Sequence, residues 1–419
     1  MSMTAVEKIL SSHAGEEVRA GSFVEARVDL VLANDITGPL AIEIFREMGA
    51  GRVFDPDKVV LVPDHFVPNK DVRSAEQARI LRQFAREQKI THYFELGEMG
   101  IEHVLLPEKG LVMPGQVIVG ADSHTCTYGA LGAFATGVGS TDVAAAMALG
   151  RLWFRVPETL RLEFRGTPSP AAGAKDLILH AIGEIGVDGA RYMALEFSGP
   201  AMEKLSVEGR LTMANMAVEA GAKVGLFAVD AKTREYLGQD VRGVETDPDA
   251  SFTTRVLDVD GLPPLVAAPH LPSNVRPAEE LRHVRVDQVY IGSCTNGRLE
   301  DLEAAASILK GHRVAPGVRV LVVPGSQAVY LAALRRGIIE TFVEAGAAVS
   351  TPTCGACLGG HMGVLAGGER CLATTNRNFV GRMGHKSSEV YLAGPAVAAA
   401  TALTGYITDP REVVSYAAG

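Results

Sequence analysis

The chain has 419 residues, of which 47% are hydrophobic and 21% charged, and its formal net charge is −9 at pH 7. This length allows two or three domains with buried cores, and the acidic balance argues against a nucleic-acid partner. No apolar stretch approaches the roughly 18 residues that span a bilayer, and the first eight residues lack the apolar core of a signal peptide. Five cysteines in so long a chain do not suggest a disulfide framework. We therefore expect a cytoplasmic protein without a membrane partner.

Apolar β-branched runs alternate with stretches of helical periodicity along the chain. This alternation predicts an α/β fold with parallel sheets. The clearest expected elements, in chain order, are a strand at 58–62, a helix at 75–88, a strand at 116–119, helices at 141–149, 174–185 and 206–220, and a strand at 319–323.

Two Pro-rich stretches are candidate domain junctions, one at 166–173 and one at 262–277. They predict three domains, at 1–165, 166–280 and 281–419. Polar motifs follow the expected strands repeatedly, and reactive groups in α/β folds lie beyond the carboxyl ends of strands. We therefore expect the chemistry of this protein at those ends.

Three cysteines carry the strongest chemical signal. Cys294 follows an apolar run, and Cys354 and Cys357 form a Cys-x-x-Cys pair. Such a pair fits a redox dithiol, a zinc site completed by His361, structural thiols or an iron–sulfur cluster, and the Gly- and Asn-rich surroundings favour the cluster. A four-iron cluster held by three thiolates leaves one iron free to act as a Lewis acid. The remaining two cysteines are expected to be buried free thiols: Cys126 and Cys371.

Imidazoles lie beside carboxylates in Asp64-His65 and in Asp122-Ser123-His124, and His103 follows a glutamate. A carboxylate beside an imidazole fixes its tautomer and tunes its basicity for proton transfer. A structural role for buried histidines is the alternative.

Two further pairs are candidates for ligand binding. Asn215 and Glu219 lie four apart on an expected helix and so face one side, although a solvated helix face has the same pattern. Arg377 and Arg382 lie in a polar loop, and guanidinium groups bind carboxylates with two parallel hydrogen bonds. The arginines predict a small polyanionic acid as ligand, with an ordinary surface loop as the alternative.

Four motifs, in their expected order and across nearly the whole chain, resemble the aconitase superfamily: Gly120 to Thr125, Gly292 to Gly297, Thr353 to Cys357 and Asn376 to Arg382. The length resembles the large subunit of its two-subunit members. The resemblance implies three αβα-type domains around one [4Fe–4S] cluster per subunit. It also implies a separate small subunit that supplies the mobile fourth domain, since nothing after Arg382 is long enough to form it.

The resemblance assigns roles to individual residues. Cys294, Cys354 and Cys357 match the cluster ligands, and Asp64 and His65 match the dyad that protonates the leaving hydroxyl. The other matched catalytic residues are His103, Asp122, His124 and Glu219, the last as the support of His103. The matched substrate-binding residues are Asn34, Ser123, Asn215, Arg377 and Arg382, and the matched cluster environment is Asn296 and Asn376. Asn34 departs from the glutamine of single-chain aconitases.

The implied function is that of a hydro-lyase that isomerises 2-isopropylmalate and 3-isopropylmalate by dehydration and rehydration in leucine biosynthesis. Homoaconitate, citraconate or 2,3-dimethylmalate are alternative substrates. The base and one carboxylate-binding arginine belong to the fourth domain, so the chain should be inactive alone. Two other classes are an iron sensor that binds RNA after losing its cluster and an electron carrier, which three thiolates disfavour.

Overall fold

The structure is a computed structural model that describes residues 2–414. The chain divides into two compact units that each combine distant segments. The first unit comprises Met1–Glu98, Leu106–Phe164 and Ala190–Leu257, and the second comprises Met99–Leu105, Arg165–Gly189 and Asp258–Gly419. Sheets with mostly parallel neighbours and covering helices form both, which confirms the α/β prediction, although β1–β7 and the pairs of β12 are antiparallel. The domain boundaries at 165 and 280 stay a prediction.

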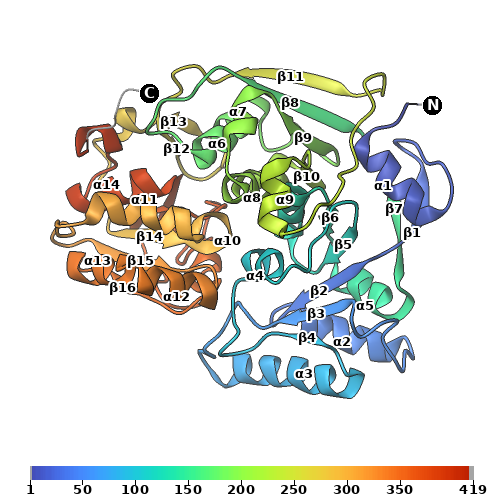
Figure 1. The fold of residues 1–419 in the computed structure, drawn as a ribbon. Coiled ribbons are helices and arrows are strands. Elements are labelled where there is room, and N and C mark those ends of the chain that lie inside the picture. The colour runs from blue at the N-terminus through green and yellow to red at the C-terminus, as the bar shows by residue number, and fades with distance from the viewer. Residues whose placement is uncertain (1, 415–419) are drawn as a thin grey trace. The chain divides into compact units, whose positions relative to one another are not determined.

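The first unit contains a five-stranded sheet in which all neighbours are parallel, in the order β4-β3-β2-β5-β6. Its strands are β2 (Leu30–Asn34), β3 (Val59–Val62), β4 (His92–Tyr93), β5 (Val117–Gly120) and β6 (Phe134–Gly137). Every residue of β2, β3 and β5 is buried, as expected for apolar runs covered on both faces. The helices of this region are α1 (Ala5–Ala14), α2 (Gly38–Glu47), α3 (Val72–Gln88) and α5 (Ser140–Leu149), and α2 packs between α3 and α5 (Figure 1).

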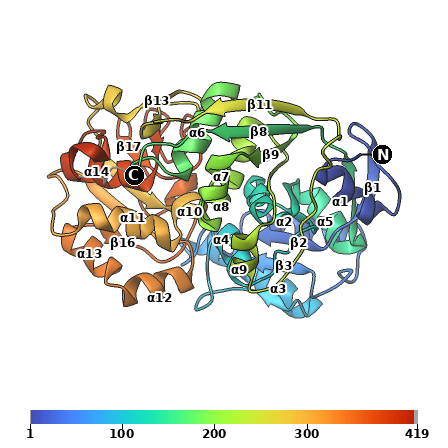
Figure 2. The same ribbon diagram turned by 45° about the horizontal axis from the view of Figure 1, so that its top comes forward.

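A four-stranded sheet in the order β10-β9-β8-β11 and an antiparallel ribbon of β1 and β7 complete the strands of the first unit. Both ribbon views show β8 and β11 side by side (Figures 1 and 2). The strands are β1 (Phe23–Arg27), β7 (Arg151–Arg155), β8 (Thr159–Arg165), β9 (Ala194–Ser198), β10 (Val224–Phe227) and β11 (Thr253–Asp258). The helices are α7 (Pro200–Lys204), α8 (Val207–Asn215), α9 (Ala231–Leu237) and the 3₁₀ helices η1 (Ser123–Leu131) and η2 (Met216–Ala220).

The second unit is built on a seven-stranded mixed sheet in the order β13-β12-β18-β17-β14-β15-β16. β14 pairs in parallel with both β15 and β17, whereas β12 is antiparallel to β13 and β18. The strands are β12 (Leu265–Ala267), β13 (Val275–Pro277), β14 (Gln288–Gly292), β15 (Arg319–Val323), β16 (Ala348–Val349), β17 (Arg370–Ala373) and β18 (Glu389–Ala393).

The helices that lie in this second unit, or begin in it, are α4 (Glu102–Glu108), α6 (Ala174–Ile185), α10 (Ser293–Asn296), α11 (Leu299–Leu309), α12 (Gln327–Arg335), α13 (Ile338–Ala345), α14 (Pro395–Thr404), and the 3₁₀ helices η3 (Ala278–Leu281), η4 (Gly355–Leu358) and η5 (Pro410–Glu412). The core packs β14 and β15 against α11, α13 and α14. Within residues 2–414, no helix combines the length and the apolar character needed to cross a bilayer.

The expected helices are present, with differences in their bounds. α6 has the predicted bounds, and α3 begins three residues early because the Asp71 carboxylate caps the amide of Ser74. The helix expected at 206–220 instead ends at Asn215 and continues as η2. The carbonyl of Asn215, at this junction, accepts a hydrogen bond from the Cys126 thiol at 3.4 Å.

Candidate functional site

The predicted site residues fall into two groups, one in each unit. The first unit carries Asn34, Asp64, His65, Asp122, Ser123, His124, Asn215 and Glu219, and the second carries His103, Cys294, Asn296, Cys354, Cys357, Asn376, Arg377 and Arg382. Each group lies largely beyond the carboxyl ends of the parallel strands of its own sheet.

In the first unit, three neighbouring strands deliver acidic groups to one edge of the sheet. β2, β3 and β5 are mutually parallel in the order β3-β2-β5, and Asp35, Asp64 and Asp122 follow their ends. The Asp35 carboxylate is fully buried and accepts the main-chain N–H groups of residues 64, 65 and 66 at 3.0, 2.9 and 2.8 Å. Asp35 therefore fixes the backbone that presents the Asp64-His65 dyad.

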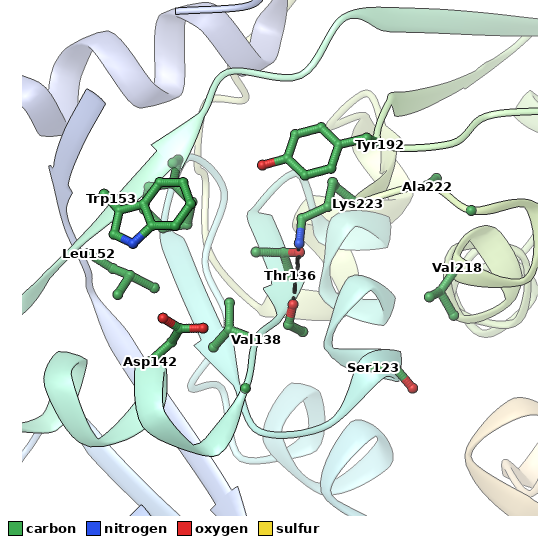
Figure 3. A pocket seen from close by; sticks show the side chains of 14 residues that line it. Ser123, Thr136, Val138, Asp142, Leu152, Trp153, Tyr192, Val218, Ala222 and Lys223 are labelled. Carbon is green, nitrogen blue, oxygen red and sulfur yellow. Dashed lines mark hydrogen bonds between the residues drawn. The ribbon is translucent and has the colours of Figure 1, made fainter. Parts of the chain in front are cut away.

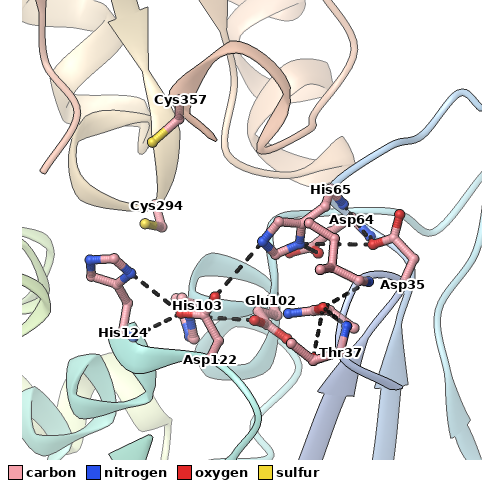
Figure 4. A network of polar contacts seen from close by, with 12 residues as sticks. Asp35, Thr37, Asp64, His65, Glu102, His103, Asp122, His124, Cys294 and Cys357 are labelled. Carbon is pink, nitrogen blue, oxygen red and sulfur yellow. Dashed lines mark hydrogen bonds and ion pairs between the residues drawn. The ribbon is translucent and has the colours of Figure 1, made fainter. Parts of the chain in front are cut away.

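His65 lies among carboxylates (Figure 4). Its Nδ1 is 2.5 Å from Asp64 Oδ1 and 3.8 Å from Asp35 Oδ1, and its Nε2 is 3.8 Å from Asp122 Oδ2. Burial alone would lower the pKa of His65, but the surrounding carboxylates raise it to about 10. The ring is therefore an imidazolium at neutral pH, which suits a general acid.

His124 is held between two carboxylates at the start of η1. The Asp122 side chain caps the His124 amide at 2.7 Å and approaches its Nδ1 at 3.3 Å, while Glu219 Oε1 lies 3.0 Å from Nε2. The resemblance assigned Glu219 to His103, which stays a prediction, and it did not indicate this contact with His124. The sequence offered no signal for it, because the two residues are 95 positions apart.

The other polar candidates of this unit are buried by local contacts. Asn215 Nδ2 donates to the Thr127 hydroxyl at 2.9 Å, and both Asn215 and Glu219 are buried, so the solvated-face alternative is wrong. The amide oxygen of Asn34 accepts the N–H groups of Ile36 and Thr37 at 3.0 and 3.1 Å. That oxygen is thus engaged in the turn that leads into α2.

Ser123 contributes to the wall of a pocket of about 540 Å³ within the first unit (Figure 3). Trp153 and Tyr192 form aromatic walls, and Lys223 donates to the carbonyl of Gly137 at 3.4 Å. Ser123 is the one predicted site residue that lines this pocket.

In the second unit, Cys294 follows β14, an interior strand of the sheet. The chain leaves β14 through Gly292 at φ 134° and Ser293 at φ 85°. A β-carbon on Gly292 would lie 2.1 Å from the carbonyl oxygen of Val323, so only glycine fits. The left-handed Ser293 is a strained conformation of the kind found at functional sites, and it leads directly into the buried Cys294.

The amide of Asn376 brings two of the predicted ligands together. Its Nδ2 lies 3.4 Å from the sulfur of Cys294, and its Oδ1 lies 3.9 Å from that of Cys357. Cys354 and Cys357 are joined by one turn, in which the Cys357 N–H donates to the Cys354 carbonyl at 3.0 Å. All three cysteines are buried and none is in a disulfide.

The phenol of Tyr290 is buried near the cysteines of this unit, Cys371 included. Burial raises the pKa of its phenol well above the usual value, and the charges of all three cysteines raise it further. Its buried hydroxyl has no hydrogen-bond partner among residues 2–414. Three buried cysteine sulfurs are soft donor atoms, and together with the unused Tyr290 hydroxyl they fit an iron–sulfur cluster.

His103 is attached to the Cys294 turn through Arg298. The Arg298 guanidinium donates to the carbonyl oxygens of Cys294 at 3.0 Å and of His103 at 3.2 Å. The His103 Nε2 lies 3.5 Å from Glu102 Oε1, and both side chains are buried. Arg298 was not predicted, although it directly follows the motif that carries Cys294.

The two predicted arginines follow β17 and are half-buried, so the loop is not simply a solvated surface. Arg382 Nη2 lies 3.8 Å from the sulfur of Cys357. The prediction of buried free thiols for Cys126 and Cys371 is confirmed. Burial raises the pKa of Cys371 to about 12, which keeps it a neutral thiol.

Lys175 was also missed. Its ammonium is buried and contacts Asn296 Oδ1 at 3.2 Å and the carbonyl oxygens of Thr374 and Thr375 at 2.9 and 2.6 Å. A signal existed, because a lysine in the first turn of a helix opposes the helix dipole. Asp35 gave no comparable signal, since it reads as part of the turn after β2.

Comparison with known proteins gives one consistent result. The model of the aconitase family (aconitate hydratase) matches residues 7–405. The 3-isopropylmalate dehydratase large subunits of Moorella thermoacetica, Heliobacterium modesticaldum and Halothermothrix orenii are 64%, 59% and 58% identical to this chain, covering 99% of it and 100% of their own lengths. The holo-form of aconitase X from Thermococcus kodakaraensis matches with a TM-score of 0.50 at 15% identity, covering 89% of each chain, and supports the fold alone.

Proposed function

Because the chain belongs to the aconitase family, we infer that it is the large subunit of a 3-isopropylmalate dehydratase. The enzyme is a hydro-lyase that interconverts 2-isopropylmalate and 3-isopropylmalate in leucine biosynthesis. The full-length identity to relatives with this name supports the assignment over other members of the family.

The observation that carries the chemistry is the amide of Asn376 between the sulfurs of Cys294 and Cys357. It supports Cys294, Cys354 and Cys357 as the ligands of a [4Fe–4S] cluster, one per chain, in which one iron lacks a protein ligand. When bound, the cluster supplies a Lewis acid that polarises the carbon–oxygen bond of the substrate.

His65 is the proposed general acid. Its imidazolium gives its Nε2 proton to the departing hydroxyl, which leaves as water, while Asp64 holds Nδ1 and stabilises the charged ring. The base that removes the proton from the neighbouring carbon is assigned to the small subunit. Readdition of water in the opposite sense restores the proton to His65 and places the hydroxyl one carbon away, with no net redox change.

The remaining polar residues orient the reacting groups. We assign Asp122, Glu219 and His124 to one hydrogen-bonded relay, and His103 with Glu102 to a second imidazole–carboxylate pair. Arg377 and Arg382 are the proposed carboxylate-binding groups, because a guanidinium matches a carboxylate with two hydrogen bonds. Ser123, Asn215 and Asn34 remain proposed substrate-side residues, and Asn296 remains part of the cluster environment.

The partner implied by the relatives' name is a small subunit, which we propose carries the mobile fourth domain and completes the site. The three-domain division at 165 and 280 remains part of the proposal. The free thiols support the cytoplasm as the location, because reducing compartments keep thiols from pairing.

Turnover by the purified pair of subunits tests this function. The chain is reconstituted anaerobically with iron and sulfide, and 2-isopropylmalate, homoaconitate and citraconate are offered with and without the small subunit. We expect turnover of 2-isopropylmalate, and only with both subunits. Full activity of the isolated chain would contradict the split enzyme, and preference for homoaconitate would contradict the substrate.

A further inference from the structure

Lys175 is a buried cation that the proposed reaction does not use. It is the second residue of α6 and only 1% exposed. Its ammonium has three donors and contacts three acceptors, at 2.6, 2.9 and 3.2 Å. A full set of acceptors is what a charged amine requires when it is removed from water.

The three acceptors belong to the two segments that surround the cysteine sulfurs. Asn296 lies two residues after Cys294, and the carbonyl oxygens of Thr374 and Thr375 come directly before Asn376. Asn376 is the residue whose amide contacts the sulfurs of Cys294 and Cys357. Lys175 thus ties together, from a separate helix, the Asn296 side chain after Cys294 and the backbone before Asn376.

The buried carboxylates of Asp301 and Asp176 lie near the Lys175 ammonium. Asn296 also donates to the buried carboxylate of Asp301 at 2.9 Å, and Asp176 beside Lys175 accepts the N–H groups of Gly173 and Leu265 at 2.7 Å each. Burial lowers the pKa of Lys175 to about 7, and the charges of Asp301, Cys294 and Cys357 oppose this shift.

We propose that Lys175 is a positioning residue of the cluster site, which clamps the Cys294 turn to the Asn376 segment and places one positive charge beside the sulfur ligands. The inference rests on the proposed function, since it requires a cluster. Removing a positive charge near a redox centre disfavours the added electron, and residues that orient metal ligands change metal affinity by roughly 10- to 100-fold.

The test compares Lys175→Gln with Lys175→Arg in the complex of both subunits, reconstituted anaerobically. Glutamine keeps hydrogen-bond donors but removes the charge, whereas arginine keeps the charge. For Lys175→Gln we expect a lower reduction potential of the cluster and roughly 10- to 100-fold faster iron release to a ferrous chelator. For Lys175→Arg we expect values nearer the wild type.

Lys223→Gln is the matched control. Lys223 also donates to a main-chain carbonyl, and burial lowers its pKa too, but it belongs to the first unit. The Lys223→Gln variant should leave the reduction potential of the cluster and the iron-release rate unchanged.

Equal potentials and release rates in wild type and Lys175→Gln would overturn the proposal, as would identical losses in Lys175→Gln and Lys175→Arg. Failure of both variants to fold, without cluster added, would assign Lys175 a purely structural role and overturn it as well. If the wild-type complex itself takes up no cluster, the proposed function fails instead.

Discussion

The two units use the same topological rule for different chemistry. In each, neighbouring parallel strands end at one edge of a sheet and deliver polar residues there. In the first unit the strands end in Asp35, Asp64 and Asp122, and in the second they lead to Cys294 and Asn376. The backbone thus decides where reactive groups gather, and the first residues beyond each strand decide what they can do.

The two sheet edges also differ in the sign of the charged side chains that gather there. The first gathers carboxylates around the His65 imidazole and raises its pKa to about 10. The second places the buried basic side chains of Lys175 and Arg298 against the segment that carries Cys294. One edge is therefore suited to hold a proton and the other to hold an anionic metal centre.

The largest effect is expected in the second unit, at the sheet edge that carries Cys294 and Asn376. Cys357→Ser should lose the cluster and all turnover, because serine offers a poor ligand for iron–sulfur clusters. Cys126→Ser, at a buried thiol that donates to the Asn215 carbonyl, should keep the cluster. Visible absorption and iron content measure both, and equal loss in the two variants would refute the ligand assignment.

In the first unit, at the sheet edge that carries Asp35, Asp64 and Asp122, His65→Ala should lower kcat by roughly 100- to 10,000-fold. The visible absorption of the cluster should stay intact. The control is His13→Gln, since His13 also pairs with a carboxylate, that of Asp29, at 2.7 Å. The control should keep its kcat. If His65→Ala lost the cluster together with activity, acid catalysis by the first unit and cluster binding by the second would not be separate functions.

Asp35→Asn tests how the carboxylates set the proton affinity of His65. Replacing this carboxylate by an amide should lower the pKa of His65, because Asp35 is one of the charges that raise it. A general acid is lost as the pH rises through its pKa, so the alkaline limb of kcat should move to lower pH, by on the order of one unit. An unmoved limb with unchanged kcat would contradict the role of Asp35.

A smaller effect is expected from Arg382→Lys. Lysine keeps the charge but loses the paired hydrogen bonds of a guanidinium, so KM should rise roughly tenfold with little change in kcat. Steady-state kinetics measure the two separately, and a fall in kcat alone would point to a role other than substrate binding.

The smallest effect is expected far from either edge. Arg319 and Glu369 form a two-bond ion pair at 2.8 Å on the surface of the second unit. Glu369→Gln should change the free energy of unfolding by about 1 kcal/mol or less, with unchanged turnover. Chemical denaturation measures this, and a loss of several kcal/mol would show that surface charge matters as much as the buried edges.

Sequence reasoning located the strand ends and the residues that follow them, because buried parallel strands are continuous apolar runs, as in β3. It missed residues whose role depends on distant partners. Asp35 acts through main-chain amides 29 to 31 positions away, and Lys175 through acceptors as many as 200 positions away. Periodicity likewise could not show that the helix ending at Asn215 tightens into η2, since the apolar pattern is the same for both.

The Mössbauer spectrum of the anaerobically reconstituted complex, recorded with and without 2-isopropylmalate, tests the central claim most directly. A cluster held by Cys294, Cys354 and Cys357 should give one iron site distinct from the other three, and only that site should change when substrate binds. Four irons with the same ligation, indifferent to substrate, would contradict the account.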